Sequence, residues 1–95
     1  MKINDLHDST RSVSALAMFT GEEGKVIAIQ INKNETFKEH ITKVPAMLVC
    51  ISGMAIFENE DGFKETITQG SYIMIEPMVK HWVIASEDSQ FVLVK

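Results

Sequence analysis

Three histidines and one cysteine are the side chains in this 95-residue chain best suited to bind a metal or attack a substrate. His40 lies in the segment FKEHITKVPAMLVCISG, where polar residues give way after Pro45 to an apolar run. Imidazole is a good ligand for divalent metals, and such sites usually place further ligands nearby in the sequence. Thr42 and Ala46 occupy the positions where those ligands would be expected. The role of His40 therefore depends on what the rest of the chain places beside it.

The sequence gives less reason to expect a chemical role for the single cysteine or for the first histidine. Cys50 has no partner for an internal disulfide, and its apolar neighbours Val49 and Ile51 predict a buried thiol that acts as a small hydrophobe. No basic residue lies near it in sequence to lower its pKa. His7 lies in the polar segment MKINDLHDSTR and is expected to be solvated.

The composition is typical of a single globular domain. The hydrophobic share is 45% and the charged share is 23%, as in ordinary folded proteins. Nine basic and thirteen acidic residues give a net charge of −4, which disfavours binding to nucleic acid and anionic membranes. The N-terminus lacks the apolar core of a signal peptide, and no apolar run approaches the length of a membrane span. We therefore expect a cytoplasmic protein without a nucleic-acid or membrane partner.

The chain has a polar beginning and a β-rich remainder. Residues 1–14 show no clean hydrophobic period and are expected to form an arm, whereas residues 15–95 form one domain. In that domain, short apolar segments alternate with turns rich in glycine and charge. The dipeptide Asp61-Gly62 is the strongest hairpin signal, and the acidic run around it is expected to be a solvated turn. About eight strands without a long helix predict an all-β fold, an antiparallel barrel or jelly roll.

Side-chain alternation predicts that the strand over residues 46–51 is covered on both sides. Successive strand residues face opposite ways, so His40 and Thr42 share a face. Farther along, one face carries Ala46, Leu48 and Cys50, and the other carries Met47, Val49 and Ile51. A sheet that is wet on one side would not tolerate this pattern, so a second sheet or a second subunit must cover the outer face.

Trp82 extends this argument to oligomerisation. It follows His81 and therefore faces the opposite side of its strand, where packing between layers or subunits is expected. Together with outward-facing Ile84 and the segment 46–51, Trp82 would leave a large apolar patch on a monomer. The arm 1–14 is too polar to cover that patch alone. We therefore expect a homodimer in which the same surface of each chain meets its mate.

The spacing of the landmark residues resembles the cupin family. The first motif of that family runs glycine, five residues, His-x-His, three or four residues, glutamate, six residues, glycine; in this chain the corresponding residues are Asn34, His40, Thr42, Ala46 and Gly53. The second motif runs glycine, five residues, Pro-x-Gly, two residues, histidine, three residues, asparagine; here the corresponding residues are Gly70, Glu76 (with Pro77 one place late), Met78, His81 and Ala85. Asn34 is a suitable replacement for glycine because asparagine tolerates the left-handed backbone conformation.

The resemblance implies a small single-domain bacterial cupin whose metal-binding motifs are degenerate. Cupins of this kind bind a divalent metal through three histidines and one glutamate and catalyse dioxygenase, isomerase or decarboxylase reactions. Only His40 and His81 keep ligand side chains, and Glu76, in the turn ahead of His81, is the one further acid that could reach the mouth of the barrel. Two imidazoles hold zinc, nickel, manganese or iron weakly.

The resemblance also implies a small, mostly apolar pocket inside the barrel. Its lining residues would be Thr42, Ala46, Leu48, Cys50, Val83 and Ala85. We therefore favour a protein of unassigned activity that binds a small apolar or aromatic molecule in the barrel, beside an incomplete metal site. One alternative is a metal-dependent enzyme that uses His40 and His81. A second alternative is a structural dimerisation module.

Overall fold

The computed structural model describes residues 1–95 and contains one short 3-10 helix and nine strands. The elements are η1 (Ile3–Leu6), β1 (Val13–Thr20), β2 (Lys25–Ile31), β3 (Thr36–His40), β4 (Ala46–Ser52), β5 (Met54–Asn59), β6 (Lys64–Thr68), β7 (Tyr72–Ile75), β8 (His81–Ala85) and β9 (Ser89–Val94). No helix in this structure has the length and the apolar character of a membrane span.

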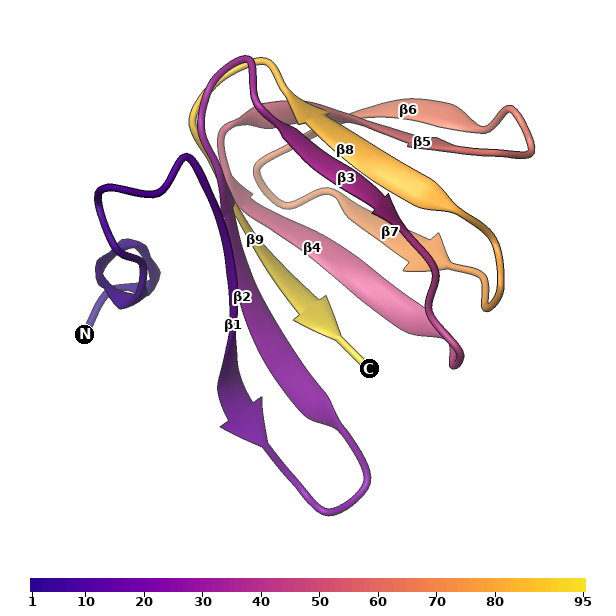
Figure 1. Cartoon of the computed structure of the whole chain (residues 1–95), viewed down its shortest axis with the longest axis horizontal. Coiled ribbons are helices and arrows are strands. Elements are labelled where there is room, and N and C mark those ends of the chain that lie inside the picture. The colour runs from indigo at the N-terminus through magenta and orange to yellow at the C-terminus, as the bar shows by residue number, and fades with distance from the viewer.

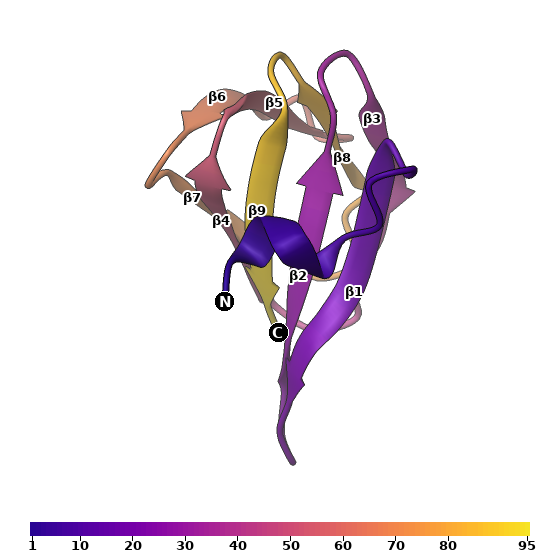
Figure 2. The ribbon, with the colours of Figure 1, turned by 90° about the vertical axis from the view of Figure 1, so that its left-hand side faces the viewer.

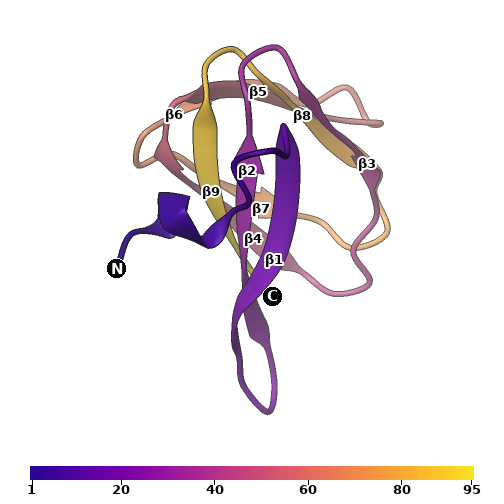
Figure 3. The same ribbon diagram turned by 60° about the vertical axis from the view of Figure 1, so that its left-hand side comes forward.

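Two antiparallel sheets face each other across the core (Figure 1). The five-stranded sheet has the order β1-β2-β9-β4-β7, and the four-stranded sheet has the order β3-β8-β5-β6. The chain crosses repeatedly from one sheet to the other, as between β2 and β3 and between β8 and β9. The β1–β2 hairpin extends beyond the rest of the molecule (Figure 3). The sequence prediction of an antiparallel jelly roll is confirmed, with nine strands in place of about eight.

Gly53 marks the point at which the chain passes from one sheet to the other. It separates β4, in the five-stranded sheet, from β5, in the four-stranded sheet, and has a φ of 93°. A side chain at this position would collide with the backbone of Asp88 and with Ser89. The predicted hairpin at Asp61-Gly62 is present, and it joins β5 to β6 in antiparallel register. These local signals explain why the turns between these strands could be predicted from the sequence.

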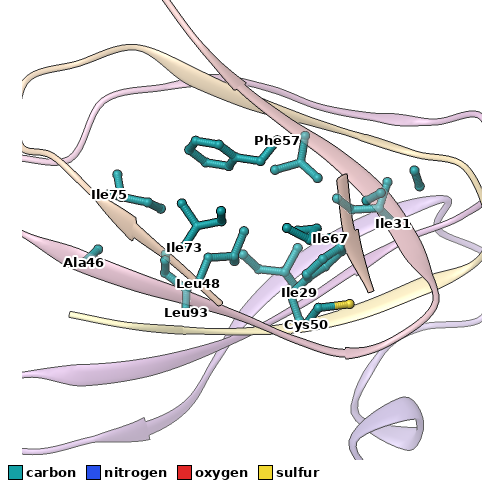
Figure 4. Close-up of a cluster of buried hydrophobic side chains, with 14 residues drawn as sticks. Ile29, Ile31, Ala46, Leu48, Cys50, Phe57, Ile67, Ile73, Ile75 and Leu93 are labelled. Carbon is teal, nitrogen blue, oxygen red and sulfur yellow. The ribbon is translucent and has the colours of Figure 1, made fainter. Parts of the chain in front are cut away.

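The core lies between the two sheets and contains side chains from seven strands, four in the five-stranded sheet and three in the four-stranded sheet (Figure 4). It consists of Ile29, Ile31, Ala46, Leu48, Cys50, Ala55, Phe57, Ile67, Ile73, Ile75, Val83, Ala85, Phe91 and Leu93. The predicted burial of Cys50 is confirmed, and its thiol donates to the carbonyl of Ser52 at 3.4 Å. Burial raises the pKa of the Cys50 thiol, which keeps it protonated and unreactive.

The N-terminal segment folds back against the outer face of the five-stranded sheet. Figure 2 shows η1 crossing in front of β9 and β2. The expectation that His7 is solvated is wrong, because only 8% of its surface is exposed and its Nδ1 hydrogen-bonds to Ser14 Oγ at 2.8 Å. The β1 strand begins at Val13, so it includes the last two residues of the predicted arm 1–14.

The two apolar surfaces that suggested a single patch lie on different sheets. In β4, Met47 and Val49 point away from the core on the five-stranded sheet. Trp82 and Ile84 alternate with core residues in β8 and point outward from the four-stranded sheet. Trp82 does face away from His81, as alternation predicts. It does not pack between the sheets, because its strand turns that face to the outside.

Candidate functional site

The two histidines that the sequence singles out are neighbours at one end of the barrel. His40 ends β3, His81 begins β8, and the two residues are cross-strand partners with ring centroids 6.4 Å apart. From Phe37 to His40, β3 contains one residue more than the paired stretch of β8, which runs from Val83 to His81. This bulge matters because a regular ladder would place Glu39, not His40, opposite His81.

Each imidazole is oriented by a backbone carbonyl and an aromatic ring. The Nδ1 of His40 hydrogen-bonds to the carbonyl of Lys38, and the Nδ1 of His81 hydrogen-bonds to the carbonyl of Val79 at 3.3 Å. A carbonyl oxygen only accepts, so Nδ1 carries a proton in both rings. His40 stacks on Phe37 at 4.2 Å between centroids.

His81 is the more deeply placed of the pair. Only 5% of its surface is exposed, and its ring stacks on Phe57 with centroids 5.7 Å apart. Burial lowers the pKa of His81; the nearby His40 acts in the same direction, and the hydrogen bond to the carbonyl of Val79 opposes them. His81 is therefore neutral at pH 7 and offers Nε2 as an acceptor. His40, in contrast, is exposed.

A pocket of about 280 Å³ opens beside His81 at this end of the barrel. We call it the mouth pocket; it is lined by Phe57, Asn59, Asp61, Phe63, Met74, Ile75, Glu76, Val79 and His81. The structure thus brings predicted Glu76 and His81 together, while His40 does not line this pocket. Asp61 and Asn59 were missed, because the acidic run at the β5–β6 hairpin was interpreted as a solvated turn.

The interior of the barrel is filled by side chains. A second, internal cavity shares Ile75 and His81 with the mouth pocket and has a volume of only about 20 Å³. Leu48 and Val83 are among its lining residues. That space is enough for one water molecule. Ala46, Cys50 and Ala85, also expected to line a pocket, are packed in the core.

Thr42, the remaining residue expected in the pocket, is buried in the β3–β4 connection. It lines an open groove beside the β1–β2 hairpin instead of the mouth pocket. Its carbonyl accepts a hydrogen bond from the N–H of Met78 at 2.8 Å. None of the six predicted lining residues therefore lines the mouth pocket.

The side chains present do not fit the four-ligand metal centre that the sequence resemblance implies. Thr42 and Ala46 stand at two of the ligand positions and offer no imidazole or carboxylate. No group of three or more histidine, cysteine, aspartate or glutamate side chains converges anywhere in the structure. A mononuclear catalytic site generally needs three protein ligands.

The two facing antiparallel sheets form a double-sheet jelly roll. An uncharacterized conserved protein with a double-stranded β-helix domain from Klebsiella pneumoniae has a similar structure, with a TM-score of 0.85 and 16% identity over 99% of this chain and 85% of that one. A cupin superfamily protein from Desulfitobacterium hafniense has a TM-score of 0.82 and 12% identity over 96% and 84% of the two chains. KdgF from a Halomonas species has a TM-score of 0.79 and 16% identity over 96% and 86%.

No protein-family model and no curated protein matches the sequence. The likeness to solved structures is therefore structural, at identities that show the fold alone. It agrees with the spacing of His40, Gly53, Gly70 and His81, which already resembles the cupin motifs. The chain has the cupin fold.

Proposed function

We propose that this protein binds a small organic molecule with an apolar or aromatic body in the mouth pocket. The observation that carries the proposal is a pocket of about 280 Å³ in which five apolar residues surround the nearly buried His81. Small-molecule sites are typically apolar concavities with a few polar groups that fix the orientation of the ligand. The mouth pocket has this composition, and its volume lies near the lower end of the usual range of about 300 to 1,000 Å³.

The size of the pocket limits the ligand to one ring or a short branched chain. The barrel interior is a poor alternative location, because its cavity of about 20 Å³ would have to be enlarged at the cost of core packing. Phe57 and Phe63 are the aromatic contacts available in the pocket. Phe63 is 45% exposed, so a ligand could cover its ring without displacing the core.

Titration of ¹⁵N-labelled protein with indole, phenol and cyclohexanol tests the proposal. Amide shifts are expected to cluster at the β5–β6 hairpin and around Val79. Phe63→Ala should weaken binding severalfold, because it removes an aromatic wall of the pocket. Phe19→Ala is the matched control, since Phe19 is also exposed but lies outside the pocket. Shifts centred on Leu48 and Val83, or equal losses in both variants, would contradict the proposal.

We also propose that the chain forms a homodimer through the outer face of the five-stranded sheet. Cross-strand partners on β7, β4 and β9 form a continuous apolar surface there. This surface consists of Met47, Val49, Tyr72, Met74, Val92 and Val94. Tyr72 and Met74 are 62% and 63% exposed in the single chain. Large exposed apolar patches on monomers are uncommon, and a two-fold pairing would cover this one.

Light scattering distinguishes the two states. The expected mass is about twice the 10.7 kDa of one chain. Tyr72→Glu should yield a monomer, because it introduces a charge into the apolar contact beside Val49. Met78→Glu is the control, since Met78 is equally exposed but does not belong to this surface. A wild-type mass of 10.7 kDa at micromolar concentration would exclude the dimer.

A further inference from the structure

The charged groups that line the mouth pocket have one sign. Asp61, at the β5–β6 hairpin, and Glu76, in the connection after β7, are both acidic, and no lysine or arginine is among the nine lining residues. The two carboxylates come from different connections. A ligand in the pocket would therefore meet negative charge from two separate segments of the chain.

The polar neighbours of the carboxylates offer mainly hydrogen-bond acceptors. His81 uses its Nδ1–H on the carbonyl of Val79, and its Nε2 forms no hydrogen bond within the chain. Asn59 Oδ1 accepts from the backbone N–H of Asp61 at 2.9 Å and of Phe63 at 3.1 Å. The amide NH₂ of Asn59 is then the only side-chain donor, against the carboxylates and the imidazole nitrogen.

The aromatic wall of the pocket favours the same kind of ligand. Phe57 and Phe63 meet edge to face, with centroids 6.1 Å apart and ring planes at 67°. Phe57 is buried and also stacks on the ring of His81. Phe63, in contrast, is partly exposed. A partly exposed aromatic face attracts an organic cation through its quadrupole. Acceptors, negative charge and an aromatic face therefore occur in one cavity.

We propose that the mouth pocket selects a small organic cation, namely an amine with an apolar or aromatic body, over neutral and anionic molecules of the same shape. The inference rests on the proposed function, because it names the ligand class of that same pocket. A divalent metal ion is a poorer match for these acceptors, since no three ligand side chains converge. An ammonium group needs only two or three acceptors at hydrogen-bond distance, and its organic body would contact the apolar wall.

Three ligands of similar shape test the charge preference: benzylamine, benzyl alcohol and benzoate, titrated at pH 7 and low salt into the full chain. Benzylamine is expected to bind roughly tenfold tighter than benzyl alcohol, and benzoate more weakly than either. Raising the salt concentration should weaken benzylamine binding and leave benzyl alcohol unchanged, because only the charged ligand is screened.

Charge-removing variants identify the residues responsible. Asp61→Asn and Glu76→Gln should each weaken benzylamine binding severalfold while leaving benzyl alcohol binding unchanged. Asp61→Asn keeps the hairpin, because Asn-Gly is a preferred turn dipeptide. Glu39→Gln is the matched control, since Glu39 lies in a groove with Trp82 and does not line the mouth pocket. Unchanged benzyl alcohol binding also verifies that each variant is folded.

The outcomes separate this inference from the proposed function. If benzyl alcohol binds in the mouth pocket and benzylamine binds no tighter, the cation preference is overturned and the proposed function stands. If none of the three ligands shifts the pocket residues, both are overturned. If benzylamine affinity falls equally in Glu39→Gln, the attraction comes from the net charge of the chain and the inference is also overturned.

Discussion

Replacing Gly53 with alanine is expected to destabilise the fold more than the same change at the other two glycines with positive φ. The first contribution is backbone strain, because φ is 93° at Gly53, and an L-residue in the left-handed region costs about 1–2 kcal/mol. The second is a collision. The new Cβ would lie 2.7 Å from Ser89 Cα and closer still to the Ser89 hydroxyl and the Asp88 carbonyl.

The collision cannot be relieved without breaking hydrogen bonds. The Ser89 hydroxyl accepts from the Met54 N–H at 3.1 Å and lies 2.7 Å from the carbonyl of Glu87. Displacing this buried hydroxyl would cost about 1–3 kcal/mol. The sum is a loss of about 2–5 kcal/mol. Domains of this kind have a total stability of about 5–15 kcal/mol, so the variant would lose a large share of it.

Gly62 and Gly70 are the internal controls. Their φ values are 89° and 87°, and a Cβ at either position would meet nothing within 4 Å. Gly62→Ala and Gly70→Ala should therefore lose only the strain of about 1–2 kcal/mol. Urea unfolding followed by circular dichroism and by Trp82 fluorescence gives the free energies. A Gly53→Ala loss no larger than that of the two controls would refute the close-packed crossing between the sheets.

Three further predictions concern backbone strain, pH and metal. Met78 has a φ of 66° and an exposed side chain, so Met78→Gly should leave the unfolding free energy unchanged or raise it by up to about 1 kcal/mol; a loss above about 1 kcal/mol in urea would contradict this. Burial lowers the pKa of His7 and of His81 below the ordinary 6.5, so the unfolded chain binds more protons and stability should fall as the pH drops below about 6.5. Urea unfolding between pH 5 and 7.5 tests this, and His7→Gln should flatten part of the slope; stability that rises on acidification would contradict it. Because only His40 and His81 remain of the resembling ligand set, zinc, nickel or manganese should bind no tighter than about micromolar and more weakly below about pH 6 in calorimetry; an ion that survives dialysis against chelator would instead support the metal-dependent enzyme.

The features that the sequence predicted well are encoded locally. The Asp61-Gly62 turn depends on two adjacent residues. The positive φ of 69° at Asn34 agrees with its place at a glycine position of the motif. The alternation of His81 and Val83 with Trp82 follows from strand geometry alone. Local rules of this kind determine strands and turns, and the spacing between them was enough to indicate the fold.

The mouth pocket could not be predicted in this way, because it is built from segments that meet only in three dimensions. Asp61 belongs to one hairpin and Glu76 to the connection after β7, and no sequence pattern links them. The burial of His7 likewise depends on the arm folding back over the sheet to reach Ser14. The placement of His40 opposite His81 depends on a bulge in β3 that has no glycine to mark it.

Intermolecular nuclear Overhauser effects from bound benzylamine or indole would show whether the ligand occupies the mouth of the barrel or its interior. Contacts from the ligand protons to Phe63, Glu76 and Val79 are expected, because these residues line the mouth pocket and not the internal cavity. Contacts to Leu48, Val83 and Phe91, which line the internal cavity of about 20 Å³, would contradict a site in the mouth pocket.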